Sequence, residues 1–155
     1  MKHLKRTLQP GCVFALPLPS RGYAVGIITH IGRWPALIGA FGLVRMDRIP
    51  VLSEAATVLT ACPIWRKKFG PLGFSIGGWQ ILGNIQVPMA LSLLPVLDQG
   101  PLEVLEIDNL TLQPVKKRPR RQSGVVMESG AAGHEFVSAQ IDYLLNLEEN
   151  IGSGH

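Results

Sequence analysis

The sequence is short of charge. Asp, Glu, Lys and Arg make up 17% of its 155 residues, against about 25% in an average soluble domain. A surface this poor in charge often leaves an apolar area for a partner, although a small domain that buries an unusual share of its residues would have the same composition. Apolar residues reach 46%, which is enough for a hydrophobic core and argues against disorder over most of the chain. The length suits one domain of ordinary size.

Cysteine is scarce and long apolar runs are missing. Cys12 and Cys62 are the two cysteines, and without a short spacing between them they form neither a zinc motif nor a disulfide framework. Glycine, proline or charge interrupts every apolar run before the roughly 18 residues that a membrane-spanning helix needs. The basic N-terminus is not followed by the apolar stretch of a signal peptide. We therefore expect a soluble cytoplasmic protein with two buried thiols and no contact with a membrane.

Residues that could support catalysis are few. Of the four histidines, three lie in expected tails or linkers and only His30 falls in an expected strand. A pair of Cys12 and His30 would have the residue types of a nucleophile and its base, but no cysteine-enzyme motif surrounds Cys12. The acidic residues show no metal-ligand spacing. The sequence therefore favours a protein that is not an enzyme and that has no cofactor and no metal.

Short apolar runs separated by turn residues predict a mainly β fold. Residues 13–18 and 23–31 flank the turn residues 19–22, which is the pattern of a β-hairpin. Both faces of 23–31 are apolar, so this strand is expected to be buried on both sides or to curl inside a small barrel-like antiparallel sheet, SH3-like or related. The pattern at 54–59 fits either a short helix capped by Ser53 or another strand. Further strands are expected at 34–44, 63–69, 79–82 and 102–108.

The glycine-rich segment FGPLGFSIGGWQILG occupies residues 69–83. It lacks both the G-x-G-x-x-G and the G-x-x-x-x-G-K-[ST] patterns, and no long helix pattern follows it, so a phosphate cradle is not expected. Its turns would place Trp79, whose indole then acts either as a core side chain, the preferred interpretation, or as an interface anchor. The glycines expected to take positive φ angles in these turns are Gly70, Gly73, Gly77 and Gly78.

The composition changes after residue 112. Residues 113–134 are rich in basic residues, proline, serine and glycine, which predicts a linker between a β-rich domain at 1–112 and a C-terminal amphipathic helix at 135–150. The apolar stripe of this helix consists of Val137, Ile141, Leu144 and Leu145. Such a stripe needs an apolar surface, which would belong either to the β-rich domain or to a second copy of the chain in a homodimer.

Five of the fifteen basic residues stand in one run at 116–121, and the rest of the chain is nearly balanced in charge. The run contains Lys116, Lys117, Arg118, Arg120 and Arg121. Such a run attracts nucleic-acid phosphates with an affinity that depends on salt rather than on base sequence. Arg66-Lys67-Lys68 beside Trp65 would add a stacking patch. Solvated linkers have the same composition, so binding of nucleic acid is the alternative function and not the preferred one.

Three stretches carry a family resemblance: LQPGCVFALPLPSRGYAVGIITHIG at 8–32, FGPLGFSIGGWQILG at 69–83 and EVLEIDNLT at 103–111. Together they resemble the immunity protein 26 family. The coinciding positions are glycines, apolar residues and aromatics: Gly11, Val13, Phe14, Pro17, Gly22, Tyr23, Gly26, Phe69, Gly70, Gly78, Trp79 and Gly83. The sequence departs from the family pattern at Cys12, Pro71 and Gln80, where the family has acids at the first two positions and proline at the third. Members of this family are thought to bind and neutralise a toxin. If acidic residues contact the toxin in relatives, these departures imply that this chain binds a different toxin or is a diverged copy.

The resemblance implies a small bacterial protein that binds and neutralises a cognate toxin by protein–protein contact. Such a protein needs a rigid scaffold and a partner-shaped surface, with its affinity concentrated in a few aromatic or charged anchors. Steric blockade of the toxin's active site is the expected mechanism. The candidate partner-binding residues are Tyr23, Trp65, Arg66, Lys67, Trp79, Glu106 and Asp108. The segment after Thr111 lies outside the resemblance.

Overall fold

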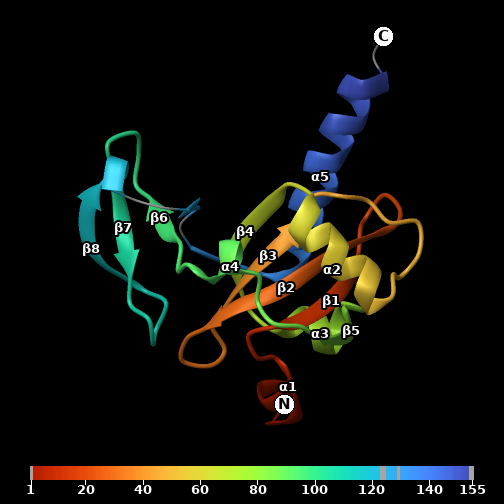
Figure 1. Cartoon of the computed structure of the whole chain (residues 1–155), viewed down its shortest axis with the longest axis horizontal. Coiled ribbons are helices and arrows are strands. Elements are labelled where there is room, and N and C mark those ends of the chain that lie inside the picture. Colours follow the sequence, from red (N-terminus) through yellow and green to blue (C-terminus); the bar gives the residue numbers. More distant parts are fainter. Residues whose placement is uncertain (1, 123–124, 129, 154–155) are drawn as a thin grey trace.

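The computed structural model of the chain describes residues 2–122, 125–128 and 130–153. Its largest element is a six-stranded sheet with the strand order β10-β4-β3-β2-β1-β5 (Figure 1). The strands are β1 Cys12–Pro17, β2 Tyr23–Ile31, β3 Leu37–Gly42, β4 Ile64–Phe69, β5 Gln80–Asn84 and β10 Ala131–Ala132. Neighbouring strands are antiparallel except for β10, which runs parallel to β4. The predicted hairpin and the strand predicted at 63–69 are confirmed.

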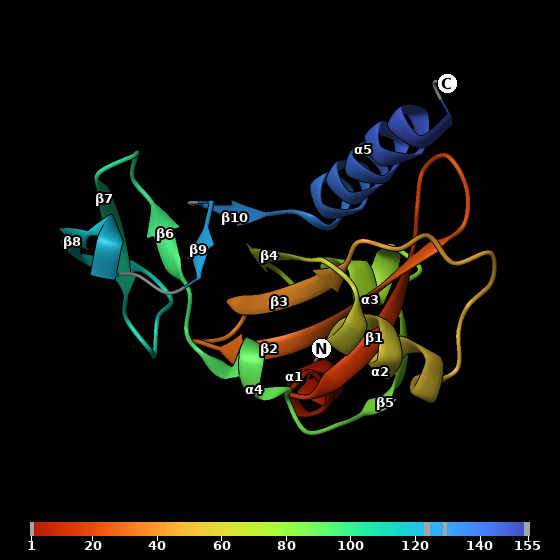
Figure 2. The same ribbon diagram turned by 45° about the horizontal axis from the view of Figure 1, so that its top comes forward.

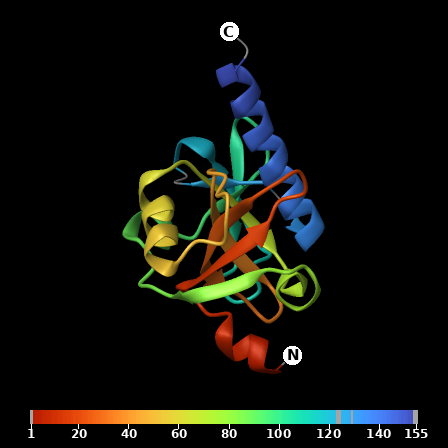
Figure 3. The ribbon, with the colours of Figure 1, turned by 90° about the vertical axis from the view of Figure 1, so that its right-hand side faces the viewer.

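The main sheet is covered on both faces, which explains why its central strands are apolar on both sides. On one face, Phe14 and its neighbours pack beneath α1 Lys2–Thr7 and α5 His134–Ser153. On the other face, Val25 and its neighbours pack beneath α2 Leu52–Ala61. Figure 3 shows α2 and α5 on opposite sides of the sheet. The C-terminal helix that the sequence predicts is therefore present, and its inner stripe docks on its own chain.

Helix α2 resolves the ambiguous stretch at 54–59. Its buried face consists of Ala55, Val58 and Leu59, which have the spacing of one helical side and lie in the apolar cluster against the sheet. Ser53 is not the cap, because the helix begins after Val51, whose backbone N–H donates to the Glu54 carboxylate. Burial of this face outweighs the strand preference of the β-branched residues in the segment.

A second sheet of four strands, in the order β8-β7-β6-β9, stands beside the first (Figures 1 and 2). Its strands are β6 Val96–Asp98, β7 Glu103–Ile107, β8 Pro114–Pro119 and β9 Val126–Met127. An apolar cluster shared by both sheets includes Ile38, Leu97 and Leu112. Within the described residues neither sheet closes, because the two outer strands of each do not pair with each other. The expected barrel is corrected accordingly: the fold is two open sheets with helices against them.

The segment at 113–134, expected to be a linker, contains regular structure. It includes β8, a 3-10 turn at Arg120–Gln122, β9 and β10. Proline stands at both ends of β8, where a missing N–H is tolerated, and the strand forms because its backbone pairs with β7. The chain then joins the second sheet as β9 and, a few residues later, the first sheet as β10 (Figure 2). None of the described helices is of a length and apolarity that would cross a bilayer.

Trp79 lies in the core, beneath the short helix α3 Leu72–Ile76. The indole is 5% exposed and stacks on Phe14, with ring centres 5.4 Å apart and planes 6° from parallel. A Cβ on Gly73 would lie 2.4 Å from the indole, so only glycine allows this close approach. Of the four glycines expected at positive φ, Gly78 has it, at 73°, and the other three do not. The segment therefore holds Trp79 by close packing under a helical turn more than by left-handed turns.

Candidate functional site

Strand β4 buries three consecutive cationic residues. Arg66, Lys67 and Lys68 are 6%, 4% and 4% exposed. Side chains alternate between the two faces of a strand, so Lys67 lies on the same face as α5 whereas Arg66 and Lys68 lie toward the second sheet. Ionised side chains are rarely buried without an opposite charge. The surroundings of β4 are therefore a candidate ligand-binding site.

The guanidinium of Arg66 has only neutral oxygen partners. Nη1 donates to the carbonyl of Leu93 at 3.0 Å, and Nη2 donates to the carbonyl of Leu91 at 3.3 Å and to the hydroxyl of Thr29 at 3.2 Å. No carboxylate of the described residues forms an ion pair with it, and its Nε is buried without a hydrogen-bond partner. Burial lowers the pKa of Arg66 to about 10, because the desolvated cation is not compensated by an anion.

The two lysines of β4 have different neighbours. Lys68 donates its Nζ to the carbonyl of Leu112 at 3.1 Å, and burial together with the charge of Lys67 lowers its pKa. The Nζ of Lys67 lies 3.7 Å from the carboxylate of Glu128 and 5.8 Å from the centre of the Phe136 ring. Because the Glu128 side chain is 61% exposed, solvent screens this pair. Among the described residues, Arg66 and Lys68 therefore have neutral oxygen acceptors and form no ion pair.

The outer edge of β4 has a strand partner over only part of its length among the described residues. Strand β10 pairs with Lys68 and Phe69. Within the described ranges no strand pairs with Ile64–Lys67 on that side. Arg66 and Lys67 are nevertheless buried as whole residues, so the lack of a strand partner there does not make their backbone accessible.

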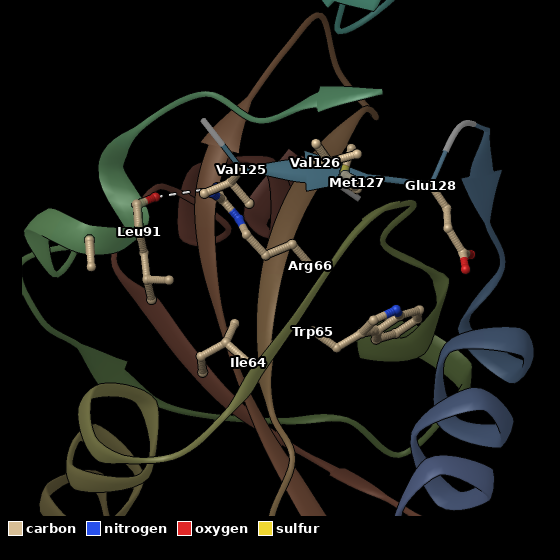
Figure 4. A pocket seen from close by; sticks show the side chains of 9 residues that line it. Ile64, Trp65, Arg66, Leu91, Val125, Val126, Met127 and Glu128 are labelled. Carbon is tan, nitrogen blue, oxygen red and sulfur yellow. Dashed lines mark hydrogen bonds between the residues drawn. The ribbon is translucent and has the colours of Figure 1, made fainter. Parts of the chain in front are cut away.

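A cleft of about 380 Å³ lies beside this edge (Figure 4). Its lining residues are Ile64, Trp65, Arg66, Ala90, Leu91, Val125, Val126, Met127 and Glu128. Consecutive strand residues point to opposite faces, so a cleft touched by three consecutive residues of β4 follows the edge of the strand and not one face of the sheet. Its opposite wall is the segment 125–128. In Figure 4 the Arg66 side chain extends from β4 toward the carbonyl of Leu91, and Trp65 lies on the side of α5. We call this feature the β4 cleft.

The β4 cleft brings together three of the seven expected partner-binding residues. Trp65 and Arg66 line it, and Lys67 follows them on the same strand. The rest of its wall was not expected, because Leu91 lies outside every element predicted from the sequence and Met127 lies in the expected linker. The β-branched pair Val125-Val126 in an otherwise polar stretch is the signal that would have indicated a strand there.

The other four expected residues lie elsewhere. Trp79 is in the core, which agrees with its preferred interpretation. Tyr23 begins β2 and is half-buried, and Glu106 on β7 is 3.2 Å from Arg118. Asp108 holds a turn, since its carboxylate accepts the backbone N–H groups of the residues two and three positions on. These residues do not form one surface with the β4 cleft.

Acids of the second sheet oppose the basic run at 116–121. The ion pairs are Lys117–Glu103, Arg118–Glu106 and Arg120–Asp98. Pairing β8 against β7 brings the first two pairs together, because the basic strand then lies beside the acidic one. Lys116 and Arg121 remain exposed, and no ion pair to either is present among the described residues. The run therefore offers phosphates less free charge than its composition suggests.

The nucleic-acid alternative makes a quantitative prediction. Lys116 and Arg121 are the two basic residues of the run that could bind phosphates. In that case the logarithm of the association constant for duplex DNA will fall with the logarithm of salt concentration, with a slope of about −2. The measurement is a gel shift across salt concentrations. Replacing Lys116 and Arg121 by glutamine is expected to abolish the shift, whereas glutamine at the exposed Lys5 and Arg6 of α1 leaves it unchanged. Absence of any shift at low salt would remove the alternative.

Cys12 and His30, the two residues considered for catalysis, have different surroundings. Cys12 is fully buried, and burial raises its pKa to about 11, so the thiol is protonated at pH 7 and a poor nucleophile. The ring of His30 is held between the carbonyl of Ser92, 3.0 Å from Nε2, and the hydroxyl of Thr29, 2.9 Å from Nδ1. Among the described residues there is no group of three or more His, Cys, Asp or Glu side chains that could hold a metal.

Helix α5 has an apolar stripe on its outer side as well as its inner one. The exposed members are Phe136, Tyr143, Leu147 and Ile151, at 49%, 57%, 42% and 73% exposure. Since the inner stripe is already buried against the sheet, a homodimer through the helix would have to use this outer stripe. The homodimer stays a prediction.

Comparison with known protein families, with curated proteins and with solved structures finds no match to this chain. The resemblance to the immunity protein 26 family therefore rests on the residues quoted above.

Proposed function

We propose that this protein works by binding another protein, and that the partner is a toxin which it neutralises. The observation that supports binding is the β4 cleft, whose wall includes Trp65 and Arg66. Trp and Arg are among the residue types most often found at the energetic centres of interfaces. The choice of a toxin comes from the resemblance of 8–32, 69–83 and 103–111 to the immunity protein 26 family.

Neutralisation of this kind requires no reacting group on the chain, because an occupied toxin active site is blocked by contact alone. What it requires is a surface that loses little freedom on binding. Strand β4 meets this requirement, since it pairs along its inner edge with β3 over its whole length and Phe69 anchors it in the aromatic core. A cleft at the edge of such a strand is available to a partner while the sheet faces stay covered.

The test is protection of bacteria that express a candidate toxin, namely the product of the gene next to this one. Ala90 is exposed and lines the β4 cleft, so Ala90→Gln fills part of the cleft without adding charge or disturbing the core. We expect the wild-type chain to rescue growth, and Ala90→Gln to weaken toxin binding, measured by calorimetry, at least about thirtyfold, the size of a hot-spot loss.

Ala139→Gln is the matched control, because Ala139 is also exposed but lies on α5 outside the cleft. It should rescue growth and bind toxin as the wild-type chain does. If no neighbouring toxin is neutralised by the wild-type chain, the toxin proposal fails. If toxin binds and Ala90→Gln binds it equally well, the β4 cleft is not the interface.

A further inference from the structure

The short helix α4 Met89–Ser92 forms part of the wall of the β4 cleft and is thinly packed. Ala90 and Leu91 line the cleft, and of residues 89–93 only Leu91 is buried. A segment with so few buried apolar contacts opens at low cost unless its backbone is held in another way. The position of this wall therefore depends on the hydrogen bonds that its backbone makes.

Two basic side chains hold three consecutive carbonyl groups at the end of α4. Arg66 donates to the carbonyls of Leu91 and Leu93, at 3.3 and 3.0 Å. His30 holds the carbonyl between them, since its Nε2 lies 3.0 Å from the oxygen of Ser92. The last carbonyls of a helix have no partner within the helix, so these bonds tie α4 to strands β2 and β4. Of the two side chains, only histidine changes its charge between about pH 5 and 8.

The hydrogen bonds of His30 fix which ring nitrogen carries the proton. A carbonyl only accepts, so Nε2 of His30 carries the hydrogen that is given to Ser92. In the neutral ring Nδ1 is then an acceptor, and it takes the hydroxyl hydrogen of Thr29, 2.9 Å away. Thr29 lies at a register shift of β2, a β-bulge, which lets its hydroxyl reach the ring of the next residue. The same hydroxyl oxygen accepts an N–H from Arg66 at 3.2 Å, so the neutral ring completes a chain of hydrogen bonds from the guanidinium to α4.

We propose that His30 is a pH-sensitive latch for α4, which holds the segment on the sheet when the ring is neutral and loosens it when the ring is protonated. Acid would then loosen one wall of the β4 cleft. The inference concerns the chain by itself and does not depend on the identity of its partner.

Protonation disturbs the chain of hydrogen bonds at Thr29. With a hydrogen on both nitrogens, Nδ1 has to donate to the Thr29 hydroxyl, whose own hydrogen must turn to the carbonyl of Ile38, 3.3 Å away. The hydroxyl oxygen then faces two cations, the imidazolium and the guanidinium of Arg66. Strand β3, which pairs with β2 at His30, and the segment 85–95 have no ionisable side chain that could offset the added charge.

The effect of pH has a definite sign. Burial lowers the pKa of His30 from the usual 6.5, the bond to Ser92 opposes this shift, and the charge of Arg66 adds to it. When α4 opens, the ring reaches water and its pKa returns toward about 6.5. The open state therefore takes up the proton first, and opening becomes easier as pH falls below about 6.5. Cys12, the titratable residue of β1, stays uncharged in this range because burial raises its pKa to about 11.

The first experiment measures amide hydrogen exchange at Leu91 in the full chain by NMR, between about pH 7.5 and 5.5. The N–H of Leu91 donates to the carbonyl of Pro88 at 2.8 Å, so its exchange reports opening of α4. After correction for the intrinsic effect of pH on exchange, we expect protection at Leu91 to fall by about two- to tenfold, the range that uptake of one proton allows. Amides in the ladder between β1 and β2 should lose less, and the imidazole of His30 should titrate below pH 6.5. Constant protection at Leu91, or titration of His30 at or above 6.5, overturns the proposal.

The second experiment removes the titration and keeps the hydrogen bonds. Glutamine has a donor and an acceptor at its tip but takes up no proton in this range, so His30→Gln should keep α4 closed at neutral pH and abolish the response to acid. His134→Gln is the matched control, because His134 begins α5 on the other face of the sheet, and it should leave the response at Leu91 unchanged. A His30→Gln chain that responds to acid as the wild-type chain does contradicts the proposal. If His30→Gln does not fold, the titration of the wild-type chain decides the question.

Discussion

Replacing Trp79 with alanine is expected to lower the free energy of unfolding by about 3–5 kcal/mol. The indole is stacked on Phe14 and lies edge-on to Phe74, with ring centres 5.4 and 5.3 Å away, so its removal leaves a cavity at the centre of the aromatic core. Gly73 is already in contact with the indole through its backbone and cannot fill the space. Urea denaturation followed by circular dichroism measures the change.

Ile76 provides the control for Trp79. It belongs to the same glycine-rich segment but is 72% exposed, so Ile76→Ala should change the free energy of unfolding by no more than about 0.5 kcal/mol. Should Trp79→Ala be unfolded in buffer, Trp79→Phe, which keeps a ring in place, is expected to fold with intermediate stability. A loss below about 1 kcal/mol for Trp79→Ala would show that the indole is not a core element.

Replacing Arg45 with alanine is expected to cost about 3 kcal/mol or more and to release helix α5 from the sheet. The Arg45 side chain is 4% exposed and bonds to three residues of the helix, with distances of 2.8 Å to Asp142, 2.8 Å to Asn146 and 2.8 Å to Glu149. Without it, the nearly buried Asp142 carboxylate loses its cation and keeps only its hydrogen bonds from Ser20. Faster amide hydrogen exchange along α5, together with urea denaturation, measures the effect.

Arg21 provides the control for Arg45, because it forms an ion pair with the same helix at the surface. Its side chain is 61% exposed and lies 3.0 Å from Glu149, so Arg21→Ala should cost less than about 1 kcal/mol and leave exchange of α5 unchanged. Equal losses for Arg21→Ala and Arg45→Ala would contradict the prediction.

The cluster of Asp142, Arg45 and Ser20 also makes the free energy of unfolding depend on pH. Burial by itself raises the pKa of Asp142, but hydrogen bonds from Ser20 and Arg45 outweigh it, and the pKa in the folded protein lies below the usual 3.8. The unfolded chain therefore takes up the proton first, so the contribution of Asp142 is complete above about pH 4 and is lost as pH falls through its folded pKa. We expect the free energy of unfolding to decline more steeply in this range for the wild-type chain than for Arg45→Ala.

The first sheet was largely predictable because its signals are local. The strands of the hairpin carry apolar residues on both faces and are joined by a Pro-Ser-Arg-Gly turn, and both properties are visible within residues 12–31. Of the second sheet only β7 was predicted, by the strand expected at 102–108; β6 has three residues and β9 has two. Strands this short have no periodicity of their own and exist through pairing with distant segments. The closure expected of a barrel also depends on such distant pairing.

The β4 cleft shows a second limit of prediction from sequence, which concerns whether a run of basic residues is buried or exposed. In the sequence, Arg66-Lys67-Lys68 has the appearance of a solvated charge run, and the basic run at 116–121 does too. Burial of the first run is decided by segments far along the chain, since the carbonyls of Leu91, Leu93 and Leu112 receive its hydrogen bonds. Partial neutralisation of the second run is decided by its pairing with β7. No local pattern distinguishes the two cases.

The position of β9 and β10 has one more consequence. Each has two residues, and they belong to different sheets, so within the described ranges short ladders hold the wall at 125–128. Segments held in this way open at low cost while the rest of a protein stays folded. Small shifts of residues 125–128 relative to β4 would therefore change the width of the β4 cleft, so its volume depends on how firmly two very short strands hold their places.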